Sequence, residues 1–490
     1  MNEEGQATEL KRSLGLVDAT MIVAGSMIGS GIFIVSADMA RAVGSGGYLI
    51  LLWIITGVIT VLAALSYGEL AGMMPKAGGQ FVYIQRAYGN LISFLYGWTV
   101  FTVISTGVIA AVAVAFAKYS AIFFPVLSNE IFSFAFTEKI KWAVTVGQIY
   151  AILSIVLLTF INSRGVNSGK TIQTFFTSAK LVALFALIVL GIGIGLKHDT
   201  LAQNFSHAWE ASTTTFKDGV LTVVPIAGIA LLGAMGSTII NSLFSADAWN
   251  NVTFIAGEIK DPKRNIPRSL FAGTLIVTII YILANVAYLS LLPLKGDPHA
   301  ADVTGLGIQF ATNDRVGAAA ASIIFGDTAL FIMAGLIMVS TFGCNNGLIL
   351  AGARVYYAMA KEKLFFHKAG DVNENKVPAN ALWYQCAWAC ALCLTGTYKD
   401  LVNYATFASM IFYMVTIAGI FVLRKKEPGT ERPYKAFGYP VLPALYILAA
   451  LAICVILIIY DGRNTGMGLL FVGTGIPVYY LTVGKKKQVQ

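Results

Sequence analysis

The sequence predicts an all-α integral membrane protein with about twelve transmembrane helices. Of its 490 residues, 57% are hydrophobic and 12% are charged, and the mean hydropathy is +0.73. About twelve apolar segments of roughly 18 residues or more can be drawn, each long enough to cross about 30 Å of hydrocarbon. Two of these segments are interrupted by residues that disfavour a helix, which predicts a binding site inside the membrane.

The first span, residues 14–43, contains the first interruption, Gly25 to Phe33. Glycine costs roughly 1 kcal/mol relative to alanine in a helix, and serine competes for backbone hydrogen bonds. A broken membrane helix offers free N–H groups to a carboxylate and free carbonyls to an ammonium, the two charged ends of an amino acid. The alternative is close helix packing, because Gly25 and Gly29 have the spacing of a small-xxx-small contact.

Three further spans are expected before the next functional candidate, and proline with paired glycines after the first of them predicts a tight turn at residues 75–79. These spans cover about residues 48–74, 91–116 and 142–161.

The fifth span, residues 171–196, carries Lys180. This lysine lies about ten positions past Lys170, which at 1.5 Å per residue is about 15 Å deep and near the midplane. An intramembrane lysine indicates a functional site, either as a fixed substitute for a metal cation or as a titrating proton carrier. The alternative is a span that begins later, with Lys180 at the membrane interface.

The sixth span begins near Val220 and contains the second interruption, Leu243 to Trp249. Asp247 lies within it, and a carboxylate in a membrane is costly unless it is paired or hydrated, so we expect it to line a cavity. The alternative is a purely structural role in capping the unwound segment. Because the two interruptions lie five spans apart, the halves enter the membrane from opposite sides, as in an inverted repeat with a midplane site.

The remaining spans are expected at residues 269–292, 328–354, 379–395, 401–423, 441–460 and 466–483. The predicted organisation is a cytoplasmic tail 1–13, a first inverted repeat 14–196, a second inverted repeat 220–423, two last spans within 438–484 and a C-terminal cytoplasmic tail 485–490.

The net charge of +9 does not indicate nucleic acid, because its distribution follows the membrane. If the N-terminus is inside, most of the 34 Lys and Arg residues fall in loops on that same side, as the positive-inside rule requires. Residues 1–12 are acidic as well as basic, so no cleavable signal peptide is apparent. We therefore expect a multi-pass protein of the cell membrane, in contact with lipid, with both termini cytoplasmic.

Enzymes, metal centres and channels are disfavoured by what the chain carries. The five cysteines lie in apolar segments, and the spacing of Cys390 and Cys393 has no second pair or histidine cluster beside it. No nucleophile with a base, metal triad or filter loop is evident. We expect no cofactor and no metal, whereas a receptor that binds an amino acid without transporting it stays open.

The interruptions and loops together resemble those of the amino acid, polyamine and organocation (APC) transporters, and within them the L-type amino acid transporter (LAT) family. The resemblance covers about residues 14–480, and the motifs that carry it are Gly25 to Phe33, residues 75–79 with Tyr83, Phe244 to Trp249, Glu258 to Pro267, and Glu431 to Pro433. It implies a LeuT-type fold, a 5+5 inverted repeat plus two extra helices, with helices 1 and 6 broken.

The resemblance also implies roles for individual residues. The substrate carboxylate would meet Gly29, Ser30 and Gly31. Its ammonium would meet carbonyls at Met27 and Phe244 and either Ser245 or Asp247, with the Phe244 ring as a gate. Lys180 would occupy the place that a sodium ion takes in sodium-coupled relatives, and Tyr281 and Asn403 would be an aromatic and a polar residue near the cavity.

Three departures from the family pattern affect these expectations. Ala246 stands where relatives often have an aromatic residue, and Ala248 where they usually have glycine, so side-chain preference is open. The loop 118–141 lacks the cysteine with which animal light chains bind a heavy chain, so no disulfide-linked heavy chain is expected.

The function predicted is sodium-independent exchange of neutral L-amino acids by alternating access. The alternative is proton-coupled uptake with Lys180 as the proton carrier.

Overall fold

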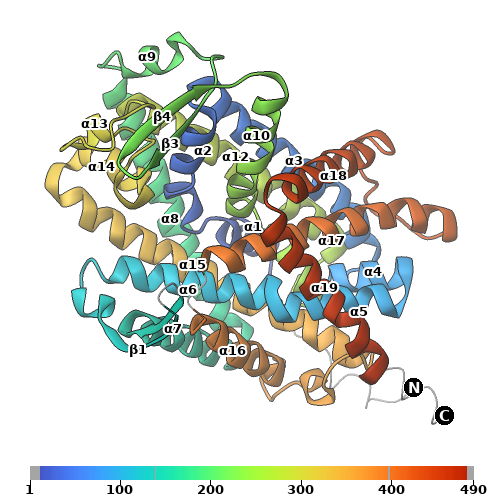
Figure 1. Ribbon diagram of the computed structural model, residues 1–490. Helices are drawn as coiled ribbons and strands as arrows, with labels where there is room; N and C mark the ends of the chain where they lie inside the picture. Colours follow the sequence, from blue (N-terminus) through green and yellow to red (C-terminus); the bar gives the residue numbers. More distant parts are fainter. Residues whose placement is uncertain (1–11, 138–139, 396–397, 483–490) are drawn as a thin grey trace, which may run out of the picture.

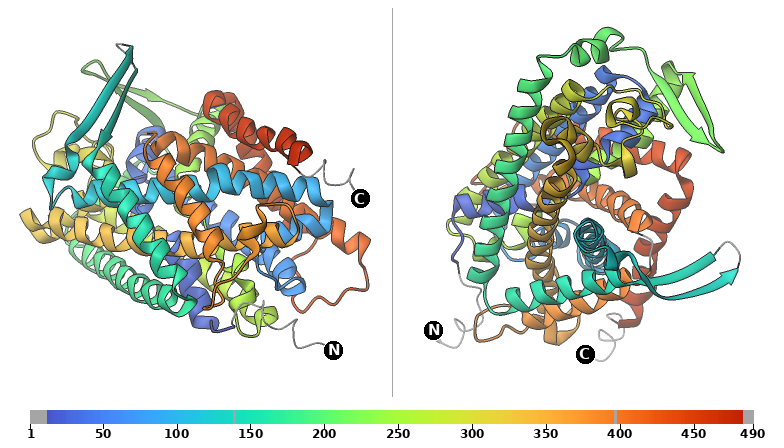
Figure 2. Two further views of the ribbon diagram at one scale, coloured as in Figure 1. Left: turned by 90° about the horizontal axis from the view of Figure 1, so that it is seen from below. Right: turned by 90° about the vertical axis from the view of Figure 1, so that its left-hand side faces the viewer.

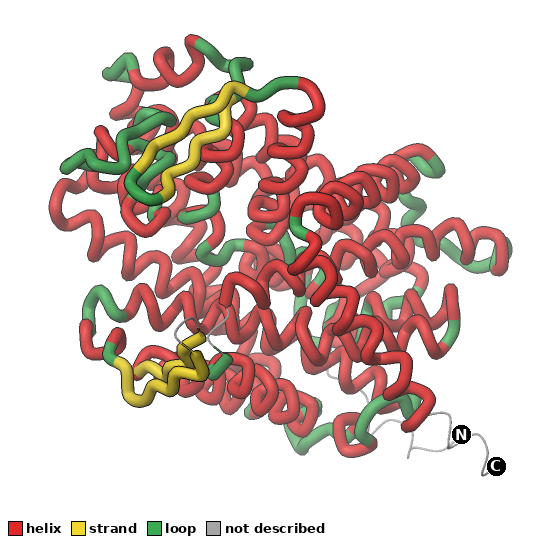
Figure 3. Tube along the Cα trace, viewed as in Figure 1, coloured by secondary structure: helices red, strands yellow, loops and turns green. Residues whose placement is uncertain are grey.

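The computed structural model describes residues 12–137, 140–395 and 398–482, and most of them are helical, as Figure 3 shows. Within this described part, nine helical segments are long and apolar enough to cross a membrane. The all-α membrane fold expected from the sequence is confirmed, whereas the count of twelve spans stays a prediction. Three expected spans are not among the nine: the first is broken and therefore too short, the ninth is a helix of 15 residues, and the twelfth is the helix Gly462–Thr482.

The first half of the chain contains these elements: α1 (Leu16–Met27), α2 (Ser36–Val43), α3 (Gly46–Met73), α4 (Gln80–Tyr88), α5 (Asn90–Thr99), α6 (Ser105–Ser120), β1 (Glu130–Thr137), β2 (Ile140–Thr145), α7 (Val146–Ser163), α8 (Val166–Gly195), α9 (Thr200–Ser206) and β3 (Ser212–Lys217). A π-helical turn, Val100–Ile104, joins α5 to α6.

The second half contains β4 (Val220–Pro225), α10 (Gly228–Ser245), α11 (Asn251–Phe254), α12 (Pro262–Leu291), α13 (Val303–Leu306), α14 (Val316–Phe325), α15 (Ala329–Lys361), α16 (Ala379–Cys393), α17 (Tyr398–Lys426), α18 (Val441–Tyr460) and α19 (Gly462–Thr482).

Both predicted interruptions are present. The helix α1 ends at Met27, and after Ile28 to Ser30 the chain makes a short 3₁₀ turn, Gly31–Phe33, before α2. The helix α10 ends at Ser245, and helical structure resumes only at α11. Figure 1 shows α1 near the middle of the molecule, where it packs against α8, α12 and α15.

The expected start of the sixth span near Val220 is wrong, because Val220–Pro225 is the strand β4, paired with β3. The turn between these strands is Asp218-Gly219, and both residues have positive φ, the geometry of a tight two-residue hairpin. The strand β4 is rich in valine, so its hydropathy is similar to that of the start of a membrane span.

A second hairpin, β1 with β2, occupies the loop that precedes α7, so the fourth span begins at Val146 rather than near residue 142. In the right-hand view of Figure 2 both hairpins extend beyond the helical bundle on the same side.

Candidate functional site

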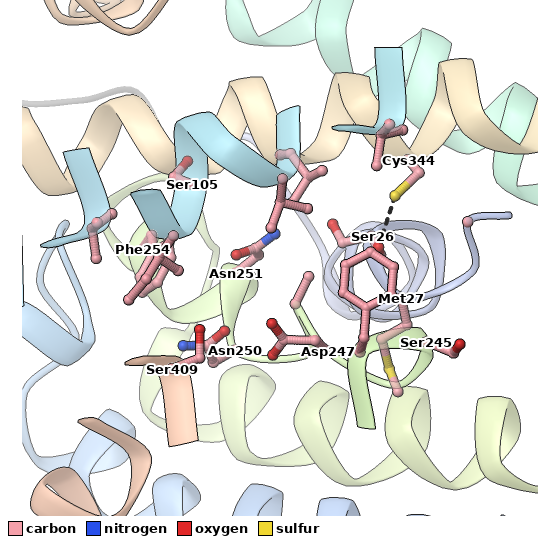
Figure 4. Close-up of a pocket in the computed structure, with 18 of the residues that line it drawn as sticks. Ser26, Met27, Ser105, Ser245, Asp247, Asn250, Asn251, Phe254, Cys344 and Ser409 are labelled. Atoms are coloured by element: carbon pink, nitrogen blue, oxygen red, sulfur yellow. Dashed lines mark hydrogen bonds between the residues drawn. The ribbon is translucent and has the colours of Figure 1, made fainter. Parts of the chain in front are cut away.

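A cavity of about 60 Å³ lies between the two broken segments. It is closed off by α6, α15 and α17, and Figure 4 shows Asp247 between Met27 and Asn250. Seven of the residues predicted for substrate binding line it: Met27, Gly29, Ser30, Gly31, Phe244, Ser245 and Asp247. The structure therefore brings both interruptions to one place.

Three other predicted residues lie outside the lining of this cavity. Lys180 and Tyr281 are buried directly behind the first break, which they contact through hydrogen bonds. Asn403 lies near the start of α17 and is not among the lining residues, although α17 does contribute Ser409 and Tyr413. The polar residues that α17 places at the cavity are therefore Ser409 and Tyr413, and not the expected Asn403.

The first break presents free backbone donors. Gly29 and Ser30 form a bend between α1 and the 3₁₀ turn, in which Phe33 N donates to Ser30 O. Within the described residues, no hydrogen bond is found for the N–H groups of Gly29, Ser30 and Gly31. Unpaired N–H groups at the start of a helical segment are suited to an anion.

The carbonyls on the other side of the break are held by Lys180 of α8. Its Nζ donates to Gly25 O and to Ile28 O, each at 2.6 Å, and lies 3.5 Å from Ser340 O. The side chain is 1% exposed. Charge-assisted hydrogen bonds of this kind are shorter and stronger than neutral ones, so the ammonium replaces the helical donors that α1 lacks at its end.

The helix α15 contributes two further donors to the same turn. Ser340 Oγ lies 3.1 Å from both Ile28 O and Gly29 O, and Cys344 Sγ lies 3.0 Å from Ser26 O, the contact drawn as a dashed line in Figure 4. The carbonyls of the broken turn are thus satisfied from α8 and α15, which allows the turn to exist within the membrane.

Tyr281 of α12 joins the two breaks. Its hydroxyl lies 3.1 Å from Met27 O and 2.9 Å from Ser245 O, and its ring packs edge-on against Trp53 at 5.3 Å. The breaks also touch directly, because a Cβ at Gly31 would overlap the Ser245 side chain. Only glycine permits this approach.

Asp247 lies in the second break and is held by a polar cluster. Tyr413 OH donates to its Oδ1 at 2.6 Å and lies 3.3 Å from Asn250 Oδ1. Asn250 Nδ2 donates to Gln80 Oε1 at 2.8 Å, which extends the cluster to α4. No Lys or Arg forms an ion pair with Asp247 within the described residues. Its carboxylate is therefore a candidate partner for a substrate ammonium.

Several residues of the site were not selected from the sequence. Ser340, Cys344, Tyr413 and Gln80 reach it from helices that are distant in the chain. A signal existed for one of them, because Cys344 lies in a stretch of glycine and asparagine within an apolar span. Among the described residues, no group of three or more His, Cys, Asp or Glu side chains could hold a metal ion.

Glu258 joins the start of α1 to α15. Its carboxylate accepts from Arg354 Nε at 2.9 Å, with both side chains fully buried. Its backbone carbonyl accepts from the N–H groups of Ser13 and Leu14 at 2.9 and 3.0 Å. The start of α1 is thereby fixed to the loop that follows α11.

A cavity of about 790 Å³ opens near the start of α1, lined by residues from α3, α4, α15 and the segment that follows α17. At its edge Arg86 Nε lies 2.6 Å from Glu427 Oε1. This hydrogen bond lowers the pKa of Glu427. Arg12, Lys76, Arg86 and Lys361 give the cavity more basic than acidic side chains, which suits the entry of anionic groups.

Comparison with known families matches residues 14–483 to the pattern described as amino acid permease. The chain belongs to the amino acid permease family. The resemblance to APC and LAT-type transporters is thus confirmed, and this permease is a multi-pass membrane transporter of amino acids rather than an enzyme.

Individual relatives agree over nearly the whole permease. The large neutral amino acids transporter small subunit 2 of Homo sapiens is 30% identical over 98% of this chain and 82% of its own. The serine/threonine exchanger SteT of Bacillus subtilis is 29% identical over 98% of both chains. The b(0,+)-type amino acid transporter 1 of Mus musculus is 27% identical over 98% of this chain and 90% of its own.

Proposed function

We propose that this permease is a sodium-independent exchanger of neutral L-amino acids that works by alternating access. The observation that carries the proposal is the Lys180 ammonium, which lies 2.6 Å from the carbonyl oxygens of Gly25 and Ile28. Two unit charges 4 Å apart repel by roughly 4 kcal/mol at an effective dielectric constant of about 20. A fixed cation therefore opposes the binding of sodium at this turn.

The relatives support the exchange and the substrate class. One is named an exchanger of serine and threonine, and another a transporter of large neutral amino acids. A small cavity lined by serine, methionine and aromatic side chains fits an uncharged substrate side chain better than a charged one.

The substrate would bind across the two breaks. Its carboxylate would accept from the N–H groups of Gly29, Ser30 and Gly31, and Phe244 would close over it as the gate. Its ammonium would lie near the carbonyls of Met27, Phe244 and Ser245 and the carboxylate of Asp247. Tyr281 already contacts two of these carbonyls, but a carbonyl oxygen accepts two hydrogen bonds and so retains one for the substrate.

Proton-coupled uptake is the second candidate, and one observation favours it. The atoms within hydrogen-bonding distance of Lys180 Nζ in the described chain are neutral carbonyl oxygens, without a carboxylate. Desolvation without an anionic partner favours the neutral amine. Lys180 could then lose and regain its proton during the cycle.

Two further features belong to the proposal. Both termini would be cytoplasmic, because most Lys and Arg residues fall on the side that this orientation makes internal. The permease would also work without a disulfide-linked heavy chain. One relative is named a small subunit, but the loop 118–141 of this chain contains no cysteine.

The test uses the purified full-length protein in liposomes. Uptake of labelled neutral, cationic and acidic amino acids is measured with and without unlabelled amino acid inside, in sodium or choline, and with and without an inward proton gradient. Uptake of neutral substrates that requires internal substrate and is the same in sodium and choline would support the proposal. Accumulation in empty liposomes driven by the proton gradient would support the second candidate instead. Sodium dependence would refute both.

A further inference from the structure

A cavity of about 530 Å³ lies beside the first two turns of α12, away from the substrate cavity. The helix α3 forms one wall, and the segment after α17 forms another. The residues that line it are Leu65, Lys263, Arg264, Pro267, Arg268, Phe271, Pro433 and Tyr434. It combines three basic side chains with an apolar floor, and neither the fold nor amino acid transport explains that combination.

Of the three basic side chains in this groove, one has an acidic partner among the described residues. Lys263 Nζ lies 3.1 Å from Glu431 Oε2 on the opposite wall. Arg264 and Arg268 are exposed, and their side chains form no hydrogen bond or ion pair with any described residue. A guanidinium is a planar fork of N–H donors that matches a phosphate, and two of them stand one helical turn apart here.

The two arginines lie at the start of a stripe of exposed side chains along α12. Along α12 the positions Arg264, Arg268, Phe271, Leu275 and Ile279 follow the three- and four-residue spacing of one helix face. The three apolar members are 41%, 37% and 48% exposed on a helix long and apolar enough to span the membrane. An apolar track therefore runs from the basic groove toward the membrane interior.

We propose that this groove binds an anionic phospholipid of the cytoplasmic leaflet. Arg264 and Arg268 hold the phosphate of the headgroup, with Lys263 beside them, and an acyl chain follows Phe271, Leu275 and Ile279. The choice of leaflet rests on the proposed orientation, since the groove is next to the loop that holds Leu14 through Lys260 N at 2.8 Å. A free phosphate would use the arginines but not the apolar track.

The test is lipid retention by the full-length protein. The protein is placed in nanodiscs of phosphatidylcholine with about one quarter phosphatidylglycerol. It is then released from the nanodiscs in the mass spectrometer, and native mass spectrometry counts the lipid molecules that stay bound. A basic residue near an anionic membrane surface changes affinity by roughly fivefold, so removing two should weaken phosphatidylglycerol binding by about 25-fold. The variant is Arg264→Gln with Arg268→Gln. The control is Lys368→Gln with Lys425→Gln, which removes two exposed charges from the same side outside the groove.

The proposal is supported if the groove variant loses phosphatidylglycerol while the control retains it, and if the variant Arg264→Lys with Arg268→Lys retains more than the glutamine variant. Millimolar inorganic phosphate should not displace the lipid. Equal retention by the glutamine variant and the control would overturn the proposal, and so would equal loss in both, which would indicate general surface charge. Displacement by phosphate would show an anion site without lipid specificity.

Size-exclusion profiles and thermal unfolding identify a glutamine variant that fails to fold. In that case the variant Arg264→Lys with Arg268→Lys is compared with the unchanged protein and decides the outcome. None of these results depends on which amino acid is transported.

Discussion

The Nζ atom of Lys180 lies 2.6 Å from the carbonyl oxygen of Gly25, one turn before α1 breaks. Substitution Lys180→Met removes this bond and the one to Ile28 with little change in side-chain length. Hydrogen bonds to charged groups contribute about 1.5–3 kcal/mol each, so we expect exchange to fall by at least about tenfold. The measurement is the initial rate of exchange in liposomes.

Lys197→Met is the control, because Lys197 is exposed just beyond the end of the same helix. Its rate should equal that of the unchanged protein. A normal rate for Lys180→Met would show that the ammonium at the break has no function in transport.

The second prediction concerns the hydroxyl of Tyr281, which contacts both breaks. Tyr281→Phe removes the contacts to Met27 O and Ser245 O but keeps the ring packed against Trp53. A buried neutral hydrogen bond contributes about 1 kcal/mol, so exchange should slow by roughly fivefold. Tyr288→Phe on the same helix is the matched control, because the buried Tyr288 hydroxyl has no partner in the described structure. Equal effects of the two substitutions would contradict the assigned role.

These contacts show what the sequence could and could not predict. The break at Gly25 to Phe33 was predictable because glycine and serine are locally unfavourable in a helix. The burial of Lys180 was predictable from its position in the middle of an apolar span, whereas its role in transport stays a prediction. The donors Ser340 and Cys344 were not, because their contacts depend on how α15 packs against α1, a relation between segments about 300 residues apart. The strand β4 was missed because exposed valines of a hairpin and apolar residues of a helix have similar hydropathy.

The third prediction concerns Asp247 and its partner Tyr413, whose hydroxyl lies 2.6 Å from Oδ1. If the carboxylate faces the substrate ammonium, Asp247→Asn should raise the half-saturating substrate concentration by about tenfold, the usual effect of losing one charged partner. Tyr413→Phe should raise it less, by about threefold. Ser409→Ala is the control, because this hydroxyl lines the same cavity without a partner among the described residues. An unchanged half-saturation for Asp247→Asn would assign the carboxylate to structure alone.

The fourth prediction concerns Ala248, which has a φ of 65°, in the left-handed region that glycine favours. A residue with a Cβ is strained there by about 1 kcal/mol, so Ala248→Gly should leave the free energy of unfolding unchanged or raise it slightly. Ala246→Gly is the comparison, because Ala246 has a φ of −95° and a buried methyl group. It should destabilise the protein by about 1 kcal/mol. Thermal unfolding in detergent measures both, and equal destabilisation would show that the Ala248 backbone is not strained.

The fifth prediction concerns the fully buried pair of Glu258 and Arg354. Glu258→Gln leaves the guanidinium buried without a counter-charge, and breaking such a pair costs about 3–5 kcal/mol. Because the Glu258 carbonyl also holds Ser13 and Leu14, the start of α1 should loosen together with the ion pair. Faster hydrogen exchange of the amides of Ser13 and Leu14 would report this.

The double variant Glu258→Met with Arg354→Met tests the electrostatic explanation. Replacing both charges by apolar side chains of similar length should restore most of the lost stability, since neither charge is then buried alone. If the double variant is as unstable as Glu258→Gln, the single substitution acts through packing rather than through an unpaired charge. If Glu258→Gln is as stable as the unchanged protein, the ion pair does not hold the start of α1 in place.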